Sequence, residues 1–255
     1  MQGQQQQAYD RGITIFSPDG RLYQVEYARE AVKRGTASIG IRTAGGVVLA
    51  VDKRIRSSLM ERTSVEKIHK ADDHIGIASA GHVADARQLI DFARRNAQVN
   101  RLRYGEPIGI ETLTKDVTDH IQQYTQVGGA RPFGVALIIG GIENGEPRLY
   151  ETDPSGTPYE WKALAVGADR KEIEDYLEDN YDEGMDLEGG VELALRALAE
   201  ANEGELRPES IGMATIPTES AEFTPIEDDQ LDSYLAEFEL LADEDEDEDE
   251  DAGDE

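Results

Sequence analysis

The chain has 255 residues, and its 54 acidic residues outnumber its 25 basic ones, which gives a formal net charge of -29 at pH 7. A length near 250 residues is compatible with a single large domain. Because the sequence contains no cysteine, disulfides, thiolate metal sites and a cysteine nucleophile are excluded. Nucleic-acid binding is also disfavoured, since proteins that bind a polyanion carry basic patches.

The negative charge is spread over the whole chain. Residues Asp243 to Glu255 hold 11 acidic residues and no basic one, and subtracting this segment from the total of -29 leaves -18 elsewhere. Such a surface is typical of a halophile's cytoplasmic protein, in which concentrated salt screens the self-repulsion. The sequence has one basic cluster, which we interpret as the end of a helix: Arg94, Arg95, Arg101 and Arg103.

Membrane insertion and export are not expected. No apolar run approaches the roughly 18 to 20 residues needed to cross a bilayer. The segment from Met1 to Tyr9 is rich in glutamine and has neither a basic flank nor an apolar stretch. We therefore expect a soluble, cytoplasmic protein.

Apolar periodicity predicts the elements in chain order. The first is a short helix at about 20–34, preceded by a turn at Ser17-Pro18-Asp19-Gly20. The pattern then predicts strands at 36–42, 46–52, 64–68 and 74–80, helices at 83–97 and 110–124, strands at 133–141, 147–153 and 159–166, helices at 171–181 and 187–201, a strand at 210–217 and a helix at 231–241.

This order of elements predicts the fold. Pairs of strands joined by tight turns alternate with pairs of helices, which favours antiparallel sheets covered by helices over a parallel βαβ sheet. We expect an α/β protein with a four-layer α/β/β/α sandwich and an extra N-terminal helix. The expected domain covers residues 13–242, between a mobile segment at 1–12 and a disordered acidic tail at 243–255.

Three sequence blocks resemble one protein family. The segment from Tyr9 to Ala28, which reads YDRGITIFSPDGRLYQVEYA, closely resembles the N-terminal region of proteasome α subunits. GHVADAR at 81–87 and RPFGV at 131–135, with DPSG at 153–156, resemble the same family in the same order. The resemblance implies the N-terminal nucleophile hydrolase fold and a non-catalytic ring subunit of the core particle, of a haloarchaeal kind.

The resemblance also raises the question of catalysis. In the active β relatives, a threonine at the mature N-terminus uses its own α-amino group as a base. Thr36 stands where that nucleophile would be, and Asp52 falls where the active family keeps a carboxylate. Counted without gaps, the family's lysine position falls on Ile68. Lys67 is then one residue early and, in a strand, would face away.

We therefore expect Thr36 to be an ordinary strand residue inside an uncut chain. Cleavage after Gly35, which would release an active threonine peptidase, stays open as an alternative, as does a self-contained halophilic binding scaffold. Neither a metal nor another cofactor is expected, since the four histidines lack ligand spacing and no phosphate-binding Gly-Lys-Ser/Thr loop is present.

The resemblance implies that Lys67 lines a pocket between neighbouring subunits. There its ammonium would pair with the C-terminal carboxylate of an activator's tail. Gly35 and Gly81 would let the tail's backbone approach. The other wall of the pocket is implied to consist of Gly20, Arg21 and Glu26. The alternative is that Lys67 is a solvated surface cation.

Two further sites follow from the family match. A cluster implied to hold the axial gate open comprises Tyr9, Asp10, Pro18 and Tyr27, and the alternative is a turn proline with scattered surface aromatics. The narrow annulus through which substrates enter is implied at Val127, Gly128 and Gly129. Family members often carry an aromatic at the position of Val127, and a plain flexible loop is the alternative there.

The implied partners are other α subunits in a seven-membered ring, catalytic β subunits, the C-terminal tails of a hexameric AAA-type ATPase, and unfolded polypeptide substrates. Nucleic acid and membranes are not among them.

Overall fold

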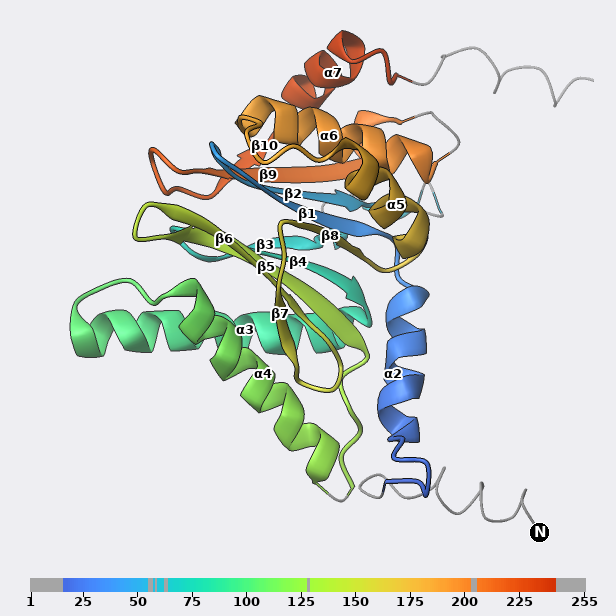
Figure 1. Ribbon diagram of the computed structural model, residues 1–255, viewed down its shortest axis with the longest axis vertical. Coiled ribbons are helices and arrows are strands. Elements are labelled where there is room, and N and C mark those ends of the chain that lie inside the picture. The colour runs from blue at the N-terminus through green and yellow to red at the C-terminus, as the bar shows by residue number, and fades with distance from the viewer. Residues whose placement is uncertain are drawn as a thin grey trace, which may run out of the picture.

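The architecture comes from a computed structural model, which describes residues 16–54, 57, 59–61, 64–127, 129–202 and 206–241. Two five-stranded sheets are stacked on each other, and helices cover both outer faces (Figure 1). The expected mobile segment at 1–12 and the acidic tail at 243–255 lie outside the described residues.

The first sheet has the strand order β10-β9-β2-β1-β8, and every neighbouring pair is antiparallel. β1 and β2 are joined by a tight turn at Ala44 and Gly45, in agreement with the predicted pairs of strands joined by tight turns. The strands are β1 (Ser38–Thr43), β2 (Gly46–Asp52), β8 (Ala163–Val166), β9 (Ile211–Pro217) and β10 (Thr224–Ile226).

The second sheet has the order β3-β4-β5-β6-β7 and is also antiparallel throughout. Because its strands follow one another in sequence, this sheet is a meander. Its strands are β3 (Ile68–Asp72), β4 (Ile75–Gly81), β5 (Val135–Glu143), β6 (Glu146–Thr152) and β7 (Pro158–Glu160).

The helices form the outer layers. Figure 1 shows α3 and α4 under the second sheet, α5 and α6 over the first sheet, and α7 above α6. α2 stands at one end of the sandwich, with only its C-terminal end next to the sheets. The helices are α2 (Tyr23–Lys33), α3 (Val83–Tyr104), α4 (Ile110–Gln126), α5 (Arg170–Asn180), α6 (Leu187–Glu200) and α7 (Asp228–Glu237), with a 3₁₀ turn at Pro208–Ser210.

β2 explains why the central strands are apolar on both faces. Every residue of this strand is buried. Val47, Leu49 and Val51 belong to the core between the two sheets, whereas Val48 and Ala50 face the core beneath α6. Since successive side chains of a strand point to opposite faces, a continuous apolar run is what a strand between two layers requires.

The predicted sandwich with its extra N-terminal helix is confirmed, and three details of the prediction are wrong. The strand expected at 64–68 begins only at Ile68. The strand expected at 159–166 is two strands in different sheets, because the chain crosses from one layer to the other after Glu160. β10 was not predicted, since a strand of only three residues, two of them exposed and one of those Pro225, carries little strand signal.

In the part of the chain that the structure describes, no helix is both long and apolar enough to cross a membrane.

Candidate functional site

Three chain segments meet at the end of the sandwich beside α2. Thr36 lies two residues before β1, Asp52 ends β2, and Lys67 directly precedes β3. The pairing of β1 with β2 places Thr36 next to Asp52, and the Thr36 hydroxyl donates to the Asp52 carbonyl oxygen at 2.7 Å. The side chain of Lys67 enters the same site from the second sheet.

The Lys67 ammonium is surrounded by oxygen atoms of the chain itself. Its Nζ lies 2.7 Å from Thr36 Oγ1, 2.8 Å from the Thr36 carbonyl oxygen, 2.9 Å from that of Ala37 and 3.0 Å from that of Asp52. Three ammonium protons are thus shared among four acceptors. Only 9% of Lys67 is exposed.

Burial lowers the pKa of Lys67 to about 7. The charge of Asp52 acts in the opposite direction, and the nearby cations Arg54 and Lys53 lower this pKa further. Because none of the four contacting oxygens belongs to an ionised carboxylate, hydrogen bonds rather than an ion pair hold the ammonium. Near neutral pH, Lys67 is therefore divided between its charged and neutral forms.

The expectation that Lys67 faces away from Thr36 is wrong. It assumed that Lys67 lies inside a strand, where a shift of one residue changes the face. β3 begins only at Ile68, so Lys67 belongs to the irregular segment before the strand, and alternation does not fix its direction. Lys67, and not Ile68, takes the position beside the threonine.

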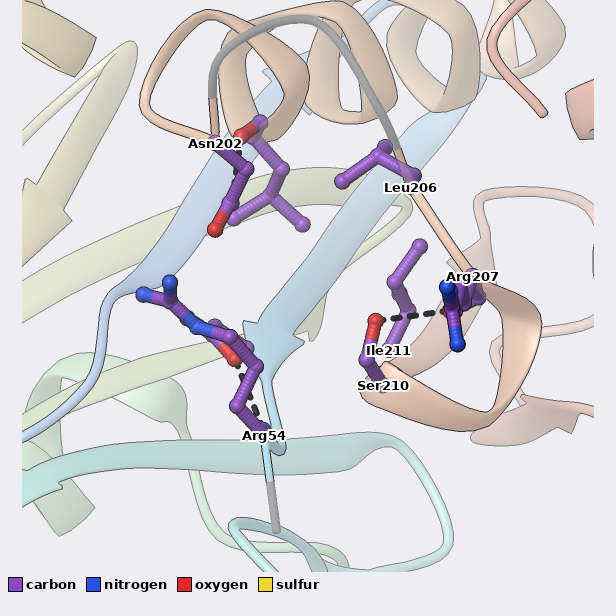
Figure 2. Close-up of a pocket in the computed structure, with 8 residues that line it drawn as sticks. Arg54, Asn202, Leu206, Arg207, Ser210 and Ile211 are labelled. Carbon is purple, nitrogen blue, oxygen red and sulfur yellow. Dashed lines mark hydrogen bonds and ion pairs between the residues drawn. The ribbon is translucent and has the colours of Figure 1, made fainter. Parts of the chain in front are cut away.

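The carboxylate of Asp52 is bound by Arg54. Its two oxygens accept from the Arg54 amide at 2.8 Å and from Arg54 Nε at 2.6 Å. Both residues border a cavity of about 270 Å³ between the C-terminal end of α6 and the start of β9. Figure 2 shows Arg54 and Asn202 on one side of this cavity and Ser210 and Ile211 on the other.

The nitrogen of Thr36 is a peptide amide. The chain runs from the last turn of α2 through Gly35, whose amide donates to Val32 at 3.0 Å and whose carbonyl accepts from Ala168 at 2.8 Å. A Cβ on Gly35 would lie 2.3 Å from the Gly81 nitrogen, so the two backbones pack too closely for any side chain. Gly35, Gly81 and Lys67 thus lie at one site.

The other expected pocket residues lie at the opposite end of α2. Arg21 and Glu26 form a bidentate ion pair, with Nε–Oε1 at 2.7 Å and NH2–Oε2 at 2.5 Å. The 11 residues of α2 separate Gly20 and Arg21 from Gly35 by about 16 Å, at 1.5 Å per residue, and Glu26 lies in the first turn of this helix. Within one chain, the six residues therefore form two separate clusters.

The gate residues that the structure describes lie at the same distal end. Pro18 is in a closed turn in which Gly20 donates to the Ser17 carbonyl at 2.8 Å and the Arg21 amide to Ser17 Oγ at 3.0 Å. Gly20 has a φ of +75°, which glycine adopts without strain. Tyr27 is 51% exposed. Tyr9 and Asp10 lie outside the described residues.

The expected annulus follows α4. Val127 is the C-cap of this helix and is 54% exposed, so it presents its side chain to the surroundings rather than to the core. Gly129 follows with a φ of +88°. Gly128 lies outside the described residues.

Asp85 is a structurally important residue that sequence reasoning did not single out. It accepts from both terminal nitrogens of Arg131 at 2.6 Å and from the Gly134 amide at 2.9 Å. Burial pushes the pKa of Asp85 upward, but these donors outweigh burial and hold it below its usual range. Asp85 thereby joins the sequence blocks at 81–87 and 131–135. The resemblance of both blocks to one family was the sequence signal that could have pointed to Asp85.

Comparison with known proteins decides the family. A family model described as "Proteasome subunit" matches residues 32–216, and a second model, the N-terminal signature of proteasome subunits of the A type, matches residues 9–31. The chain belongs to the proteasome α-subunit family. It is 80% identical over 242 residues to the proteasome alpha 1 subunit of Haloarcula marismortui, and the match covers 94% of this chain and 93% of the relative.

Other α-subunit relatives are nearly as similar. The proteasome alpha subunit of Natronomonas pharaonis is 77% identical, over 96% of this chain and 97% of the relative. A second alpha subunit of Haloarcula marismortui, alpha 2, is 67% identical, over 96% and 100%. Haloarchaea thus contain paralogous α subunits, and the expectation of a haloarchaeal core-particle α subunit is confirmed.

Proposed function

We propose that this α subunit is non-catalytic, and that it forms the gated axial opening of the core particle and the docking surface for an ATPase activator. The observation that carries the first part is the bonding around Thr36: the Gly35 amide donates to Val32, the Gly35 carbonyl accepts from Ala168, and the Thr36 hydroxyl donates to Asp52. The site contains a threonine hydroxyl, a lysine and a carboxylate within one small region. A threonine nucleophile uses its own free α-amine as the base, so catalysis by this chain would require cleavage after Gly35.

The hydroxyl itself is also unsuited to attack. It donates its proton to the Asp52 carbonyl, which is not a base, and accepts from the Lys67 ammonium. Both its proton and one lone pair are thus engaged in holding the ends of β1 and β2 together. These contacts support a structural role for Thr36 in the uncut chain.

A threonine peptidase remains the alternative because Lys67 lies within hydrogen-bond distance of Thr36 Oγ1. Cleavage after Gly35 would supply the missing amine and remove α2. The intact mass of the purified protein tests this directly. A non-catalytic subunit keeps residues 1–35 and hydrolyses peptides only together with β subunits; loss of those residues, with activity in the absence of β subunits, contradicts the proposal.

The docking proposal rests on the ammonium of Lys67 beside two glycines. A C-terminal carboxylate could replace the chain's own carbonyl oxygens as acceptor, and charge assistance would favour the exchange. Gly35 and Gly81 pack directly on each other, with no room for a side chain between them, so a tail would have to reach Lys67 beside this contact and not between the two glycines. A tail that also contacts Arg21 of the same chain must span about 16 Å, or about five extended residues. A shorter tail can contact both clusters only if the cluster around Lys67 belongs to one copy of the chain and the cluster around Arg21 to a neighbouring copy.

Gate opening is proposed as a population shift. A tail bound at Lys67 would favour one position of α2 and of the Pro18 turn, and with it the open arrangement of residues 1–12, including Tyr9 and Asp10. Tyr27 and the Val127–Gly129 annulus complete the opening. The remaining partners are proposed as a seven-membered α ring, β subunits and unfolded polypeptides, in the cytoplasm.

Lys67→Ala tests the docking site. We expect the variant to assemble with β subunits and to hydrolyse short peptides at the basal rate, but to lose stimulation by the ATPase. Lys70→Ala is a matched control, since Lys70 lies three residues away in β3, is half-exposed and pairs with Asp73. Normal stimulation of the Lys67→Ala core would contradict the docking site.

A further inference from the structure

One ion pair connects α2 to a distant part of the chain. Arg29 Nε lies 2.6 Å from Asp153 Oδ2, and the two residues are 124 positions apart. Among the ion pairs between described residues, the others that involve α2 are local: Arg21–Glu26 at its start and Lys33–Glu30 within it. Asp153 is 14% exposed, so its carboxylate is held largely inside the structure.

Asp153 also organises the turn that follows β6. Its Oδ1 accepts from the Ser155 amide at 2.8 Å and from the Ser155 hydroxyl, while the Gly156 amide donates to the Asp153 carbonyl at 2.9 Å. The two oxygens of one carboxylate therefore have different roles. One shapes the turn, and the other holds α2.

The same turn packs directly on α4. A Cβ on Gly156 would lie 2.6 Å from the Thr118 carbonyl oxygen and 2.7 Å from the Gln122 Cβ, so only glycine permits this contact. Four residues beyond Gln122, α4 ends at Gln126, and Val127 follows. A continuous series of contacts thus runs from α2 through the turn at 153–156 to the helix that carries the annulus.

The buried apolar contacts of α2 hold it to the protein without fixing its rotation as strictly. Val25, Ala28 and Val32 are buried, and hydrophobic burial of such a stripe is non-directional. A hydrogen bond between a guanidinium and a carboxylate is directional and charge-assisted. The Arg29–Asp153 pair therefore adds a directional constraint on α2 that the apolar stripe does not supply.

We propose that the turn at 153–156 is a brace that couples the resting position of α2 to α4, and that Arg29 and Asp153 are positioning residues of the gate. The proposal rests on the gate function proposed above. Without the brace, α2 leaves its resting position more easily, and the Pro18 turn at its N-terminal end moves with it. Basal opening of the gate then increases.

The test uses core particles assembled with β subunits and measures hydrolysis of a short fluorogenic peptide without activator. Arg29→Ala and Asp153→Asn should each raise the basal rate about two- to fivefold, the range set by loss of one ion pair whose cation is half-exposed. Asn keeps the oxygen that accepts from the Ser155 amide. The double variant should exceed the larger single effect only slightly, because both changes break the same contact.

Lys33→Ala is the control, since it removes a cation from the same helix whose partner, Glu30, is also on α2; its basal rate should not change. If Arg29→Ala fails to assemble, Arg29→Gln provides the same comparison with a smaller loss of packing. Rates that stay at the wild-type value in both Arg29 and Asp153 variants overturn the brace.

The same substitutions in a core that lacks residues 2–12 separate the brace from the gate. Deletion alone should raise hydrolysis, and Arg29→Ala should then add nothing. No rise on deletion contradicts the gate function itself. If deletion raises hydrolysis, two results contradict the brace alone. Either Arg29→Ala has no effect in the full-length chain, or it raises the rate of the truncated chain as much as that of the full-length one.

Discussion

The protonation state of Lys67 makes a quantitative prediction about activator binding. Burial lowers the pKa of this amine from 10.5 to about 7 in the folded chain, with Asp52 opposing the shift and Arg54 and Lys53 adding to it. A tail carboxylate binds the ammonium and not the neutral amine. Affinity for the tail should therefore be highest below pH 7 and should fall as pH rises through 7.

The size of the effect follows from the pKa. With a pKa of about 7, about nine-tenths of Lys67 is charged at pH 6 and about one-hundredth at pH 9. The Kd of a carboxylate-terminated peptide should then rise about 90-fold over this range, with about a fivefold rise between pH 7 and 8 and about a ninefold rise between pH 8 and 9. The Kd depends on pH with the same slope if Lys67 takes up its proton on binding, as long as the bound carboxylate keeps Lys67 charged.

Fluorescence anisotropy of a labelled tail peptide on the assembled core measures this Kd without interference from the pH dependence of the β active sites. The same peptide with a C-terminal amide is the control and should bind weakly at every pH. Lys67→Arg should flatten the dependence, because arginine stays charged throughout. A Kd that changes less than twofold between pH 6 and 9, or an equal slope for the amide peptide, would refute a carboxylate–Lys67 contact.

Three further predictions concern stability. Gly35→Ala should lower the free energy of unfolding by more than about 2 kcal/mol, because its Cβ would lie 2.3 Å from the Gly81 nitrogen. The added Cβ of Gly20→Ala meets no atom within 4 Å, so this variant should lose only about 1 kcal/mol of unfolding free energy, because of the φ of +75° at Gly20. Equal shifts of the thermal unfolding temperature in the two variants would argue against the close packing of Gly35 on Gly81. Asp85→Ala should lower the free energy of unfolding by about 1 to 3 kcal/mol, because it leaves the Gly134 amide unpaired. Denaturant unfolding measures this loss, and a loss below about 0.5 kcal/mol would contradict the structural role of Asp85. The folded pKa of Lys67 lies below its unfolded value, so the cost of burying the charged amine is full below pH 7 and declines between pH 7 and 10.5. In that range the free energy of unfolding of the wild type should rise by up to about 1.4 kcal/mol per pH unit relative to Lys67→Met. Parallel stability curves for the two proteins would be inconsistent with the lowered pKa.

The layers of the fold could be predicted because their signals are local. A strand such as β2, between two covered faces, needs apolar residues at every position, and its sequence GVVLAVD shows that directly. The helices α3 and α4 have apolar stripes that face one sheet. The short strands β7 and β10 were missed or merged, since three residues carry little periodic signal.

The candidate site was predicted less completely, for two physical reasons. The direction of Lys67 depends on the length of an irregular segment, and strand alternation says nothing about residues before the strand begins. The partners of Arg29 and of Asp85 lie 124 and 46 residues away. Which distant charges meet is decided by how the layers pack, and not by spacing along the chain.

Deletion of residues 2–12 tests the gate most directly. Full-length and truncated chains are assembled with the same β subunits, matched for assembled core, and compared in hydrolysis of a short peptide without activator. A gate formed by these residues predicts faster hydrolysis by the truncated core, while the truncated α ring alone stays inactive. Equal rates for the two cores would contradict the gate function proposed for this α subunit.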